Sequence, residues 1–265
     1  MLYFKLLSME INLNCDLGEK SKHHSNENDP ELLKIVNSAN VACGYHAGDE
    51  QTMQEVVKIS KENNVSIGAH PSFKDPENFG RKRMDLSASE ITKLVTDQYE
   101  ILQNIASLQG EKVSHIKPHG ALNNMACEDL ELATTLAKTI YHIDKDIIYL
   151  VPTGSKMEIA AKKLDMKIAC EIFADRNYED DGNLVSRSKK EALITNPEIA
   201  KKHVLEMVKN QAINCLSGKK IPCEIDSVCI HGDNQNSLKT AKVIKQNLMN
   251  NDLMLKPLNK LGKFN

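Results

Sequence analysis

Short apolar segments that are followed directly by polar residues recur along the chain. Seven of them have the composition of β-strands, and each ends beside acids, amides, hydroxyls or imidazoles, most with Gly or Pro nearby. The clearest is 113–116, which runs into Lys117, Pro118, His119 and Gly120, where proline lacks an N–H and glycine permits unusual dihedral angles. The predicted strands are residues 11–13, 39–43, 65–68, 113–116, 147–151, 168–173 and 228–230.

Segments with helical periodicity separate these strands. One of them opens at Ser87 with Glu90 three residues later, the spacing of a capping box. Strands joined by helices pair in parallel, and right-handed crossovers bring their carboxyl ends to one side, so we expect the polar strand ends to converge. The predicted helices are residues 50–63, 87–108, 128–140, 156–164, 197–215 and 236–249.

Two architectures fit this alternation, a closed (β/α) barrel and an open doubly wound sheet, and both bind ligands at the carboxyl ends of their strands. The barrel is favoured, because no G-x-G-x-x-G turn follows an early strand and nearly every strand end carries a functional group. The 265 residues suit one such domain, which we expect over 10–265, with 1–9 as an N-terminal extension.

The composition of the chain argues against several classes of protein. Charge is nearly balanced, with 34 basic and 36 acidic residues, and the basic residues are scattered, so a nucleic-acid partner is not expected. No apolar run reaches membrane-spanning length. Seven cysteines without a C-x-x-C pair read as thiols of a reducing, cytoplasmic compartment rather than as a structural zinc site. The sequence leaves open whether the chain forms a homo-oligomer.

The strand-end motifs resemble those of the LamB/YcsF family, in order and spacing from about residue 10 to 248. They read LNCDLGE (13–19), SANVACGYHAGD (38–49), GAHP (68–71), FGR (79–81), KPHGAL (117–122), FADR (173–176), SRS (186–188) and HGD (231–233). The resemblance implies an irregular seven-stranded (β/α) barrel of the glycoside hydrolase/deacetylase type. Two departures from the family pattern, at 20–29 and at Asn123 where Tyr is usual, bear on substrate contacts.

The resemblance also implies an activity. The chain would be one subunit of an ATP-dependent 5-oxoprolinase, which opens the lactam ring of 5-oxo-L-proline to give L-glutamate, and would work with two partners, subunits B and C. The sequence has no G-x-x-x-x-G-K-[ST] loop, since the segment at Gly154 to Lys156 lacks the upstream glycine. ATP, a cosubstrate of the complex, is therefore expected to be handled by the partners.

Opening a lactam needs a general base, stabilisation of an oxyanion and protonation of the leaving nitrogen. The strand ends offer groups of each kind, and the candidates for catalysis are Asp16, His46, His70, Lys117, His119 and His231. The candidates for substrate binding are Glu19, Asp49, Arg81, Asp175, Arg176, Arg187 and Asp233. Arginine suits a substrate carboxylate through a two-pronged contact. The aspartates could equally cap helices, and the arginines could equally be ion-paired loop residues.

A divalent metal is a further expectation, with Asp16, His46 and His70 as its possible ligands, although no H-E-x-x-H motif appears. Two other functions stay open: a metal-dependent carbohydrate deacetylase and a non-catalytic binding subunit. The remaining histidines are assigned to the surface or to helix packing. They are His23, His24, His115, His142 and His203.

Overall fold

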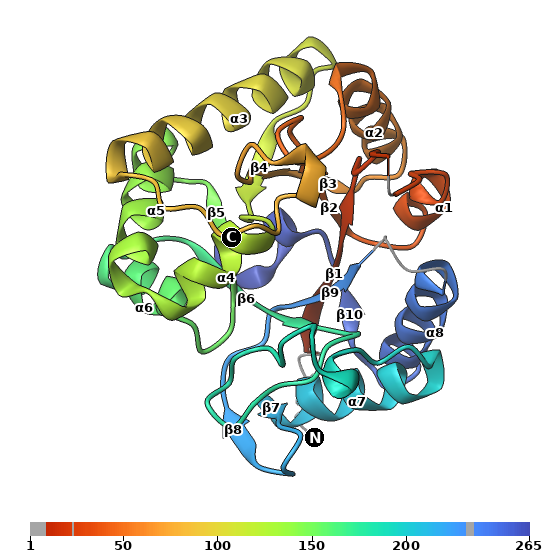
Figure 1. Cartoon of the computed structure of the whole chain (residues 1–265). Coiled ribbons are helices and arrows are strands. Elements are labelled where there is room, and N and C mark those ends of the chain that lie inside the picture. The colour runs from red at the N-terminus through yellow and green to blue at the C-terminus, as the bar shows by residue number, and fades with distance from the viewer. Residues whose placement is uncertain (1–8, 23, 232–235) are drawn as a thin grey trace.

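Seven parallel strands form a closed barrel in the computed structural model, which describes residues 9–22, 24–231 and 236–265. The strand order is β1-β2-β3-β4-β5-β6-β9, and β9 pairs back with β1 to close the ring (Figure 1). All seven predicted strands are therefore confirmed, and so is the barrel. The strands are β1 (Glu10–Leu17), β2 (Ser38–Ala42), β3 (Ser66–His70), β4 (Val113–Ile116), β5 (Ile148–Pro152), β6 (Ile168–Phe173) and β9 (Ser227–His231).

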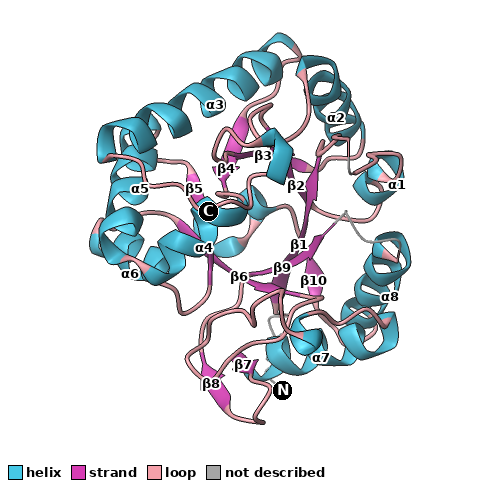
Figure 2. Ribbon diagram, in the orientation of Figure 1, coloured by secondary structure: helices cyan, strands magenta, loops and turns pink. Residues whose placement is uncertain are grey.

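Helices surround the barrel (Figure 2). Their apolar stripes pack on the outward faces of the strands. In α2, for example, Met53, Val56 and Val57 are buried at helical spacing. The capping box at Ser87 and Glu90 is present. Two short helices, α1 and α4, were not predicted. The helices are α1 (Asp29–Leu33), α2 (Glu50–Glu62), α3 (Ala88–Leu108), α4 (Gly120–Glu128), α5 (Leu130–Ile143), α6 (Lys156–Lys163), α7 (Pro197–Asn210) and α8 (Ser237–Met249).

One predicted helix, 197–215, was too long. The helix α7 ends at Asn210, because Gln211 adopts a left-handed conformation with φ of 46°. The chain then forms an antiparallel pair from β7 (Ala212–Asn214) and β8 (Lys220–Pro222). A short apolar run such as Ala212 and Ile213 fits either periodicity, so the sequence pattern could not separate the helix from the strand.

The inside of the barrel is polar. Along β1, alternate residues face inward as a pleated strand requires, and these are Asn12, Asn14 and Asp16. Asn12 donates a hydrogen bond to the Ser38 hydroxyl at 2.8 Å, and Asn14 donates one to the Ser227 hydroxyl at 2.7 Å. Polar side chains of different strands therefore satisfy one another inside the ring. The main apolar core lies between the barrel and the helices, and a smaller apolar cluster joins Ile148, Leu150 and Ala169 to Leu258 and Leu261.

His115 belongs to this polar interior, so its assignment to the surface or to helix packing was wrong. Its ring is fully buried, and Nε2 lies 3.0 Å from Asn40 Oδ1. The ring occupies space beside Gly68, where an added Cβ would lie 2.2 Å from imidazole atoms. Strand alternation turns Ser114 partly outward and His115 inward, and only the paired strands show that inward means the barrel.

The C-terminal segment covers the amino-terminal end of the barrel. There β10 (Met254–Leu255) pairs with β1, and the short 3₁₀-helix Leu258–Lys260 follows. The Leu258 backbone N–H donates to the hydroxyls of Ser38 and Ser66 at 3.1 and 3.3 Å. Since this end is filled, the opening of the barrel lies at the carboxyl ends of the strands.

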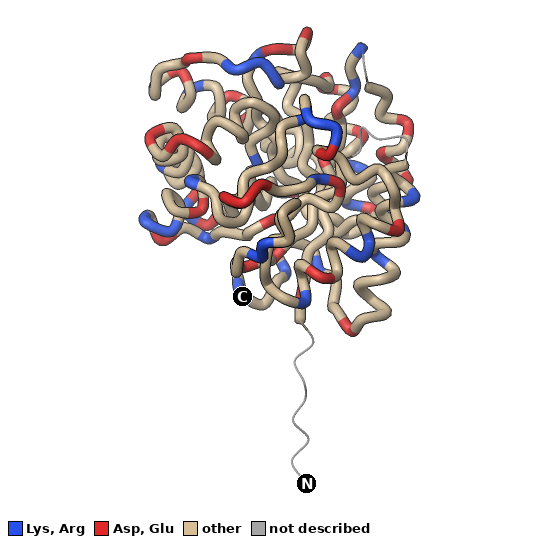
Figure 3. The backbone as a smooth tube through the Cα atoms, turned by 60° about the horizontal axis from the view of Figure 1, so that its bottom comes forward, with Lys and Arg blue, Asp and Glu red and all other residues tan. Residues whose placement is uncertain are grey.

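Expectations about membrane spans, cysteines, surface charge and the N-terminal segment can also be compared with the structure. Among the described residues no helix has the length and apolar character needed to cross a membrane. All seven cysteines are free thiols. Along the backbone in Figure 3, positions of Lys and Arg are interspersed with positions of Asp and Glu. The predicted extension, 1–9, lies outside the described residues except for Met9.

The buried carboxyl of Asp29 is expected to make the stability of the fold depend on pH. It accepts a hydrogen bond from the Gly18 backbone N–H at 2.7 Å, and burial raises the pKa of its carboxyl to about 7. Between about pH 4 and pH 7 the folded protein thus keeps a proton that the unfolded chain has lost, so stability falls as pH rises through this window. This fall in the free energy of unfolding is on the order of 1 to 3 kcal/mol. We expect it to be absent from Asp29→Asn, whose side-chain oxygen still accepts from the Gly18 N–H. Urea unfolding at pH 5 and pH 8 checks this, and equal pH dependence in both proteins would contradict it.

Candidate active site

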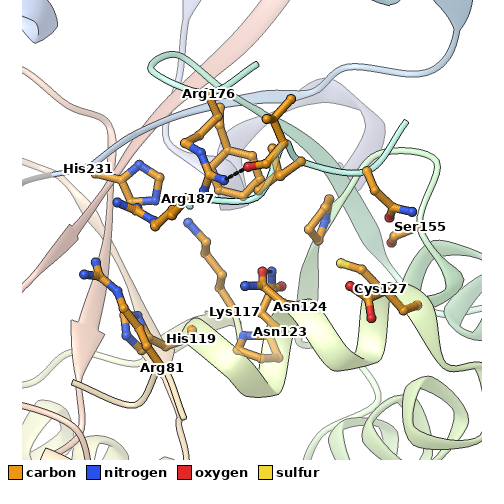
Figure 4. Close-up of a pocket in the computed structure, with 18 of the residues that line it drawn as sticks. Arg81, Lys117, His119, Asn123, Asn124, Cys127, Ser155, Arg176, Arg187 and His231 are labelled. Atoms are coloured by element: carbon orange, nitrogen blue, oxygen red, sulfur yellow. Dashed lines mark hydrogen bonds between the residues drawn. The ribbon is translucent and has the colours of Figure 1, made fainter. Parts of the chain in front are cut away.

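A cavity of about 570 Å³ opens at the carboxyl ends of the barrel strands. In Figure 4, Arg81 and His231 lie on one side of it, Lys117 lies near its centre, and Cys127 and Ser155 lie on the other side. Most of the predicted site residues line this cavity. They are Asp16, Glu19, His70, Arg81, Lys117, His119, Arg176, Arg187 and His231.

A buried ion-pair cluster forms the floor of the cavity. Lys117 follows β4, and its Nζ lies 2.9 Å from Asp16 Oδ1 and 3.3 Å from Glu171 Oε2. It also donates to Cys229 Sγ at 3.0 Å. Burial would lower the pKa of Lys117, but these neighbours raise it well above its usual value, so the ammonium stays charged.

Asp16 at the end of β1 is the anion of this cluster. Burial alone would raise the pKa of its carboxyl, but His70 and Lys117 together hold the pKa well below its usual range. Its Oδ1 also accepts from Asn40 Nδ2 at 2.8 Å, and its Oδ2 lies 3.4 Å from His70 Nε2. Asp16 is therefore a fixed, ionised carboxylate at the mouth of the barrel.

Glu171 was missed from the sequence. It lies in the middle of β6 and is buried, which raises the pKa of its carboxyl. Its Oε2 accepts from Asn14 at 3.3 Å, whereas its Oε1 has no hydrogen-bond partner among the described residues. The available signal was an acid inside the apolar segment 168–173, because a buried carboxyl needs a partner inside the fold.

Three imidazoles gather beside Asp16. The inward nitrogens of His70 and His119, Nε2 and Nδ1, lie 3.0 Å apart. The His46 ring stacks on His119 with centroids 4.0 Å apart, and its Nε2 lies 3.2 Å from Glu19 Oε1. The rings come from the ends of β3 and β4 and from the loop after β2, as the strand pattern predicted.

Burial and neighbouring imidazoles lower the pKa of both His46 and His119 well below the usual value. For His46 the neighbour is chiefly His70, and for His119 it is His46 followed by His70. Both rings are therefore neutral near pH 7, which leaves each with one donor and one acceptor nitrogen.

A second imidazole–carboxylate pair lies across the cavity. His231 at the end of β9 has Nδ1 2.8 Å from Asp175 Oδ1, and its ring stacks on Phe173 with centroids 5.5 Å apart. Asp175 thus fixes the orientation and the tautomer of His231. Asp233, predicted beside them, lies outside the described residues.

Three arginines, Arg81, Arg176 and Arg187, form a cationic wall of the cavity. The buried Arg176 guanidinium donates to the backbone carbonyl of Val185 at 2.7 Å, a bond drawn in Figure 4. Burial, followed by repulsion from Arg187, lowers the pKa of Arg176 to about 10. Arg81 also lowers it, although to a lesser extent. Converging guanidinium groups of this kind form a surface suited to an anion.

Asp49 is not among the residues that line the cavity. It caps α2, where its Oδ1 accepts from the Thr52 backbone N–H and hydroxyl, both at 2.7 Å. The capping interpretation that the sequence also allowed explains this residue. Asn123, by contrast, lines the cavity, so the departure from the family pattern lies at the site.

Three groups of three residues at this mouth have ligand atoms that lie within 4.8 Å of one another and are suited to a cation. They are Asp16, His70 and His119; Glu19, His46 and His119; and Asp16, Cys229 and His231. The predicted metal set, Asp16, His46 and His70, shares two residues with the first group. In the structure His46 lies with Glu19 instead.

A closed parallel (β/α) barrel with charged and imidazole groups at the carboxyl ends of its strands is the layout in which barrel enzymes carry their active sites. The chain belongs to the LamB/YcsF family, whose model matches residues 11–263. The predicted resemblance is confirmed.

Individual relatives agree with this. The A subunit of 5-oxoprolinase from Clostridium beijerinckii is 42% identical over 252 residues, which cover 95% of this chain and 99% of the relative. The solved structure of a lactam utilization protein from Thermus thermophilus is 33% identical and superposes with a TM-score of 0.87 over 94% of this chain and 100% of that one. A structure described as "T48 deacetylase with substrate", 12% identical with a TM-score of 0.52 over 95% and 89% of the two chains, shares the fold alone.

Proposed function

We propose that this chain is the lactam-opening subunit of an ATP-dependent 5-oxoprolinase, which converts 5-oxo-L-proline to L-glutamate. One observation carries the proposal: a single cavity joins a cationic wall to a buried acid and two sets of imidazoles. The names of the relatives, a 5-oxoprolinase subunit and a lactam utilization protein, support the same substrate class.

Each part of the cavity has a role in this reaction. Arg176 and Arg187, with Arg81, bind the substrate carboxylate and orient the ring. Water adds to the lactam carbonyl carbon and gives a proton to His231, which Asp175 orients, while Lys117 stabilises the charge that develops on the carbonyl oxygen. As the ring C–N bond breaks, His231 returns this proton to the leaving nitrogen.

The energy for ring opening comes from ATP, which we assign to the partner subunits B and C. The support is the absence of a G-x-x-x-x-G-K-[ST] loop from the sequence and the word "subunit" in the names of the relatives. We therefore expect little turnover from the purified chain alone. The free thiols agree with assembly of the complex in the cytoplasm.

Reconstitution tests this function. The purified chain, subunits B and C, ATP and 5-oxo-L-proline are mixed, and L-glutamate is measured; omission of any one component is expected to abolish its formation. No glutamate from a folded, complete complex would contradict the proposal. Turnover of an acetylated sugar by the chain alone would favour the deacetylase instead. Unchanged glutamate formation with Asp16→Ala and His119→Ala would favour a binding subunit.

Arg187→Met tests the cationic wall in the same assay. Arg187 is exposed at the cavity, so the fold is expected to tolerate the change. Loss of one charge-assisted contact, worth about 1.5 to 3 kcal/mol, raises KM for 5-oxo-L-proline roughly 10- to 100-fold. Arg83→Met is the matched control, because Arg83 also lines the cavity and its guanidinium pairs with Glu128. An equal KM for both variants would exclude Arg187 from substrate binding.

A further inference from the structure

The rings of His70 and His119 meet with two acceptors face to face. His70 Nδ1 lies 2.7 Å from the Lys117 carbonyl oxygen, so this nitrogen carries a proton and donates it. His119 Nε2 lies 3.0 Å from the Phe79 carbonyl oxygen and donates in the same way. In neutral rings the other two nitrogens are then both acceptors, yet they lie 3.0 Å apart. Two lone pairs at this distance require a positive species beside them.

Two carboxylates approach the same point. Asp16 Oδ2 lies 3.4 Å from His70 Nε2, and Glu19 Oε1 lies 3.2 Å from His119 Nδ1. A single proton shared by the two imidazoles would account only for the contact between His70 Nε2 and His119 Nδ1. A metal ion with bonds of about 2.1 Å places neighbouring ligand atoms about 3.0 to 3.4 Å apart, which matches these three distances. A fourth distance, between His70 Nε2 and Glu19 Oε1, is wider at 3.9 Å.

The surroundings hold the four side chains in place. The two backbone carbonyls that accept from the imidazoles fix the orientation of each ring and direct its inward nitrogen, as the outer partners of metal-bound histidines do. His46 stacks on His119 and contacts Glu19 Oε1 through Nε2. Its own Nδ1 is buried without a hydrogen-bond partner among the described residues, so His46 donates to Glu19 and orients this carboxylate.

We propose that Asp16 Oδ2, His70 Nε2, His119 Nδ1 and Glu19 Oε1 bind one divalent transition-metal ion. Two imidazole nitrogens with two carboxylate oxygens suit Zn²⁺ or Mn²⁺, whereas Ca²⁺ and Mg²⁺ prefer oxygen ligands throughout. This ligand set replaces His46 of the sequence prediction by His119 and adds Glu19. Its chemical role rests on the proposed function: the ion would polarise the attacking water or the lactam carbonyl.

Metal binding is measured without reference to activity. The tag-free chain is stripped with EDTA and titrated with Zn²⁺, and separately with Mn²⁺, by calorimetry and by elemental analysis after dialysis. We expect about one ion per chain and a higher Tm with metal, because the ion binds only the folded state. His70→Ala, His119→Ala and Glu19→Gln are each expected to weaken binding at least 100-fold, with thermal unfolding of the metal-free variants reporting whether each is folded.

Glu224→Gln is the matched control, since Glu224 belongs to a separate group with Cys170 and Asp226. It is expected to keep the ion. No stoichiometric binding of either metal by the folded chain would overturn the proposal, and so would binding that survives in the three ligand variants or is lost with Glu224→Gln. Glutamate formation by a metal-free complex would overturn the metal role alone, whereas metal binding without glutamate formation would overturn only the proposed function.

Discussion

Replacement of Lys117 by methionine is expected to destabilise the protein by about 3 to 5 kcal/mol. The side chain is 3% exposed, and its ammonium is the cation that Asp16 Oδ1 contacts at 2.9 Å. Methionine keeps most of the apolar stem but leaves a buried carboxylate without its partner, which is among the costliest single changes in a protein interior. Urea unfolding of the variant and of the unchanged protein at pH 7 measures the difference.

A second variant separates this electrostatic cause from lost packing. Lys117→Met combined with Asp16→Asn removes both charges, so the double variant is expected to recover much of the lost stability without recovering activity. If Lys117→Met alone unfolds within about 0.5 kcal/mol of the unchanged protein, the buried pair does not hold the barrel mouth together.

His231→Gln is expected to lower the turnover of the reconstituted complex by about 10² to 10⁴-fold, the usual contribution of a positioned acid or base. Glutamine fills similar space and still hydrogen-bonds Asp175, but it cannot deliver a proton at neutral pH. KM for 5-oxo-L-proline is expected to change little, because the cationic wall stays intact. Steady-state kinetics of glutamate formation with subunits B and C checks both values.

His142→Gln serves as the control for this variant. His142 lies on α5, where its ring bonds to the Lys138 carbonyl at 2.7 Å, away from the cavity. Its turnover is expected to equal that of the unchanged complex. A fall of less than threefold for His231→Gln would remove His231 from the chemistry.

Residues at the strand ends could be predicted because a parallel barrel brings all carboxyl ends to one mouth. This rule places Asp16, His70, Lys117 and His231 together although they lie far apart in the sequence. It cannot tell which polar residue after a strand points into the cavity. Asp49 illustrates the limit, since a helix begins directly after it and its carboxylate caps that helix.

Residues inside the barrel were harder to predict. Glu171 and Cys229 lie within the predicted strands 168–173 and 228–230, whose other residues are apolar, so the sequence pattern did not single them out. Their contact with Lys117 depends on strand pairing across the ring, which no local pattern encodes. The alternation of Asn12, Asn14 and Asp16 in one strand was the clearest available sign of a polar interior.

The position of the ligand tests the central claim most directly. A crystal of this chain soaked with 5-oxo-L-proline is expected to show the ligand at the barrel mouth, with its carboxylate within hydrogen-bonding distance of Arg176 or Arg187 and its lactam carbonyl directed toward Lys117. Density for the ligand outside this cavity, with the mouth of the barrel free of it, would contradict the account.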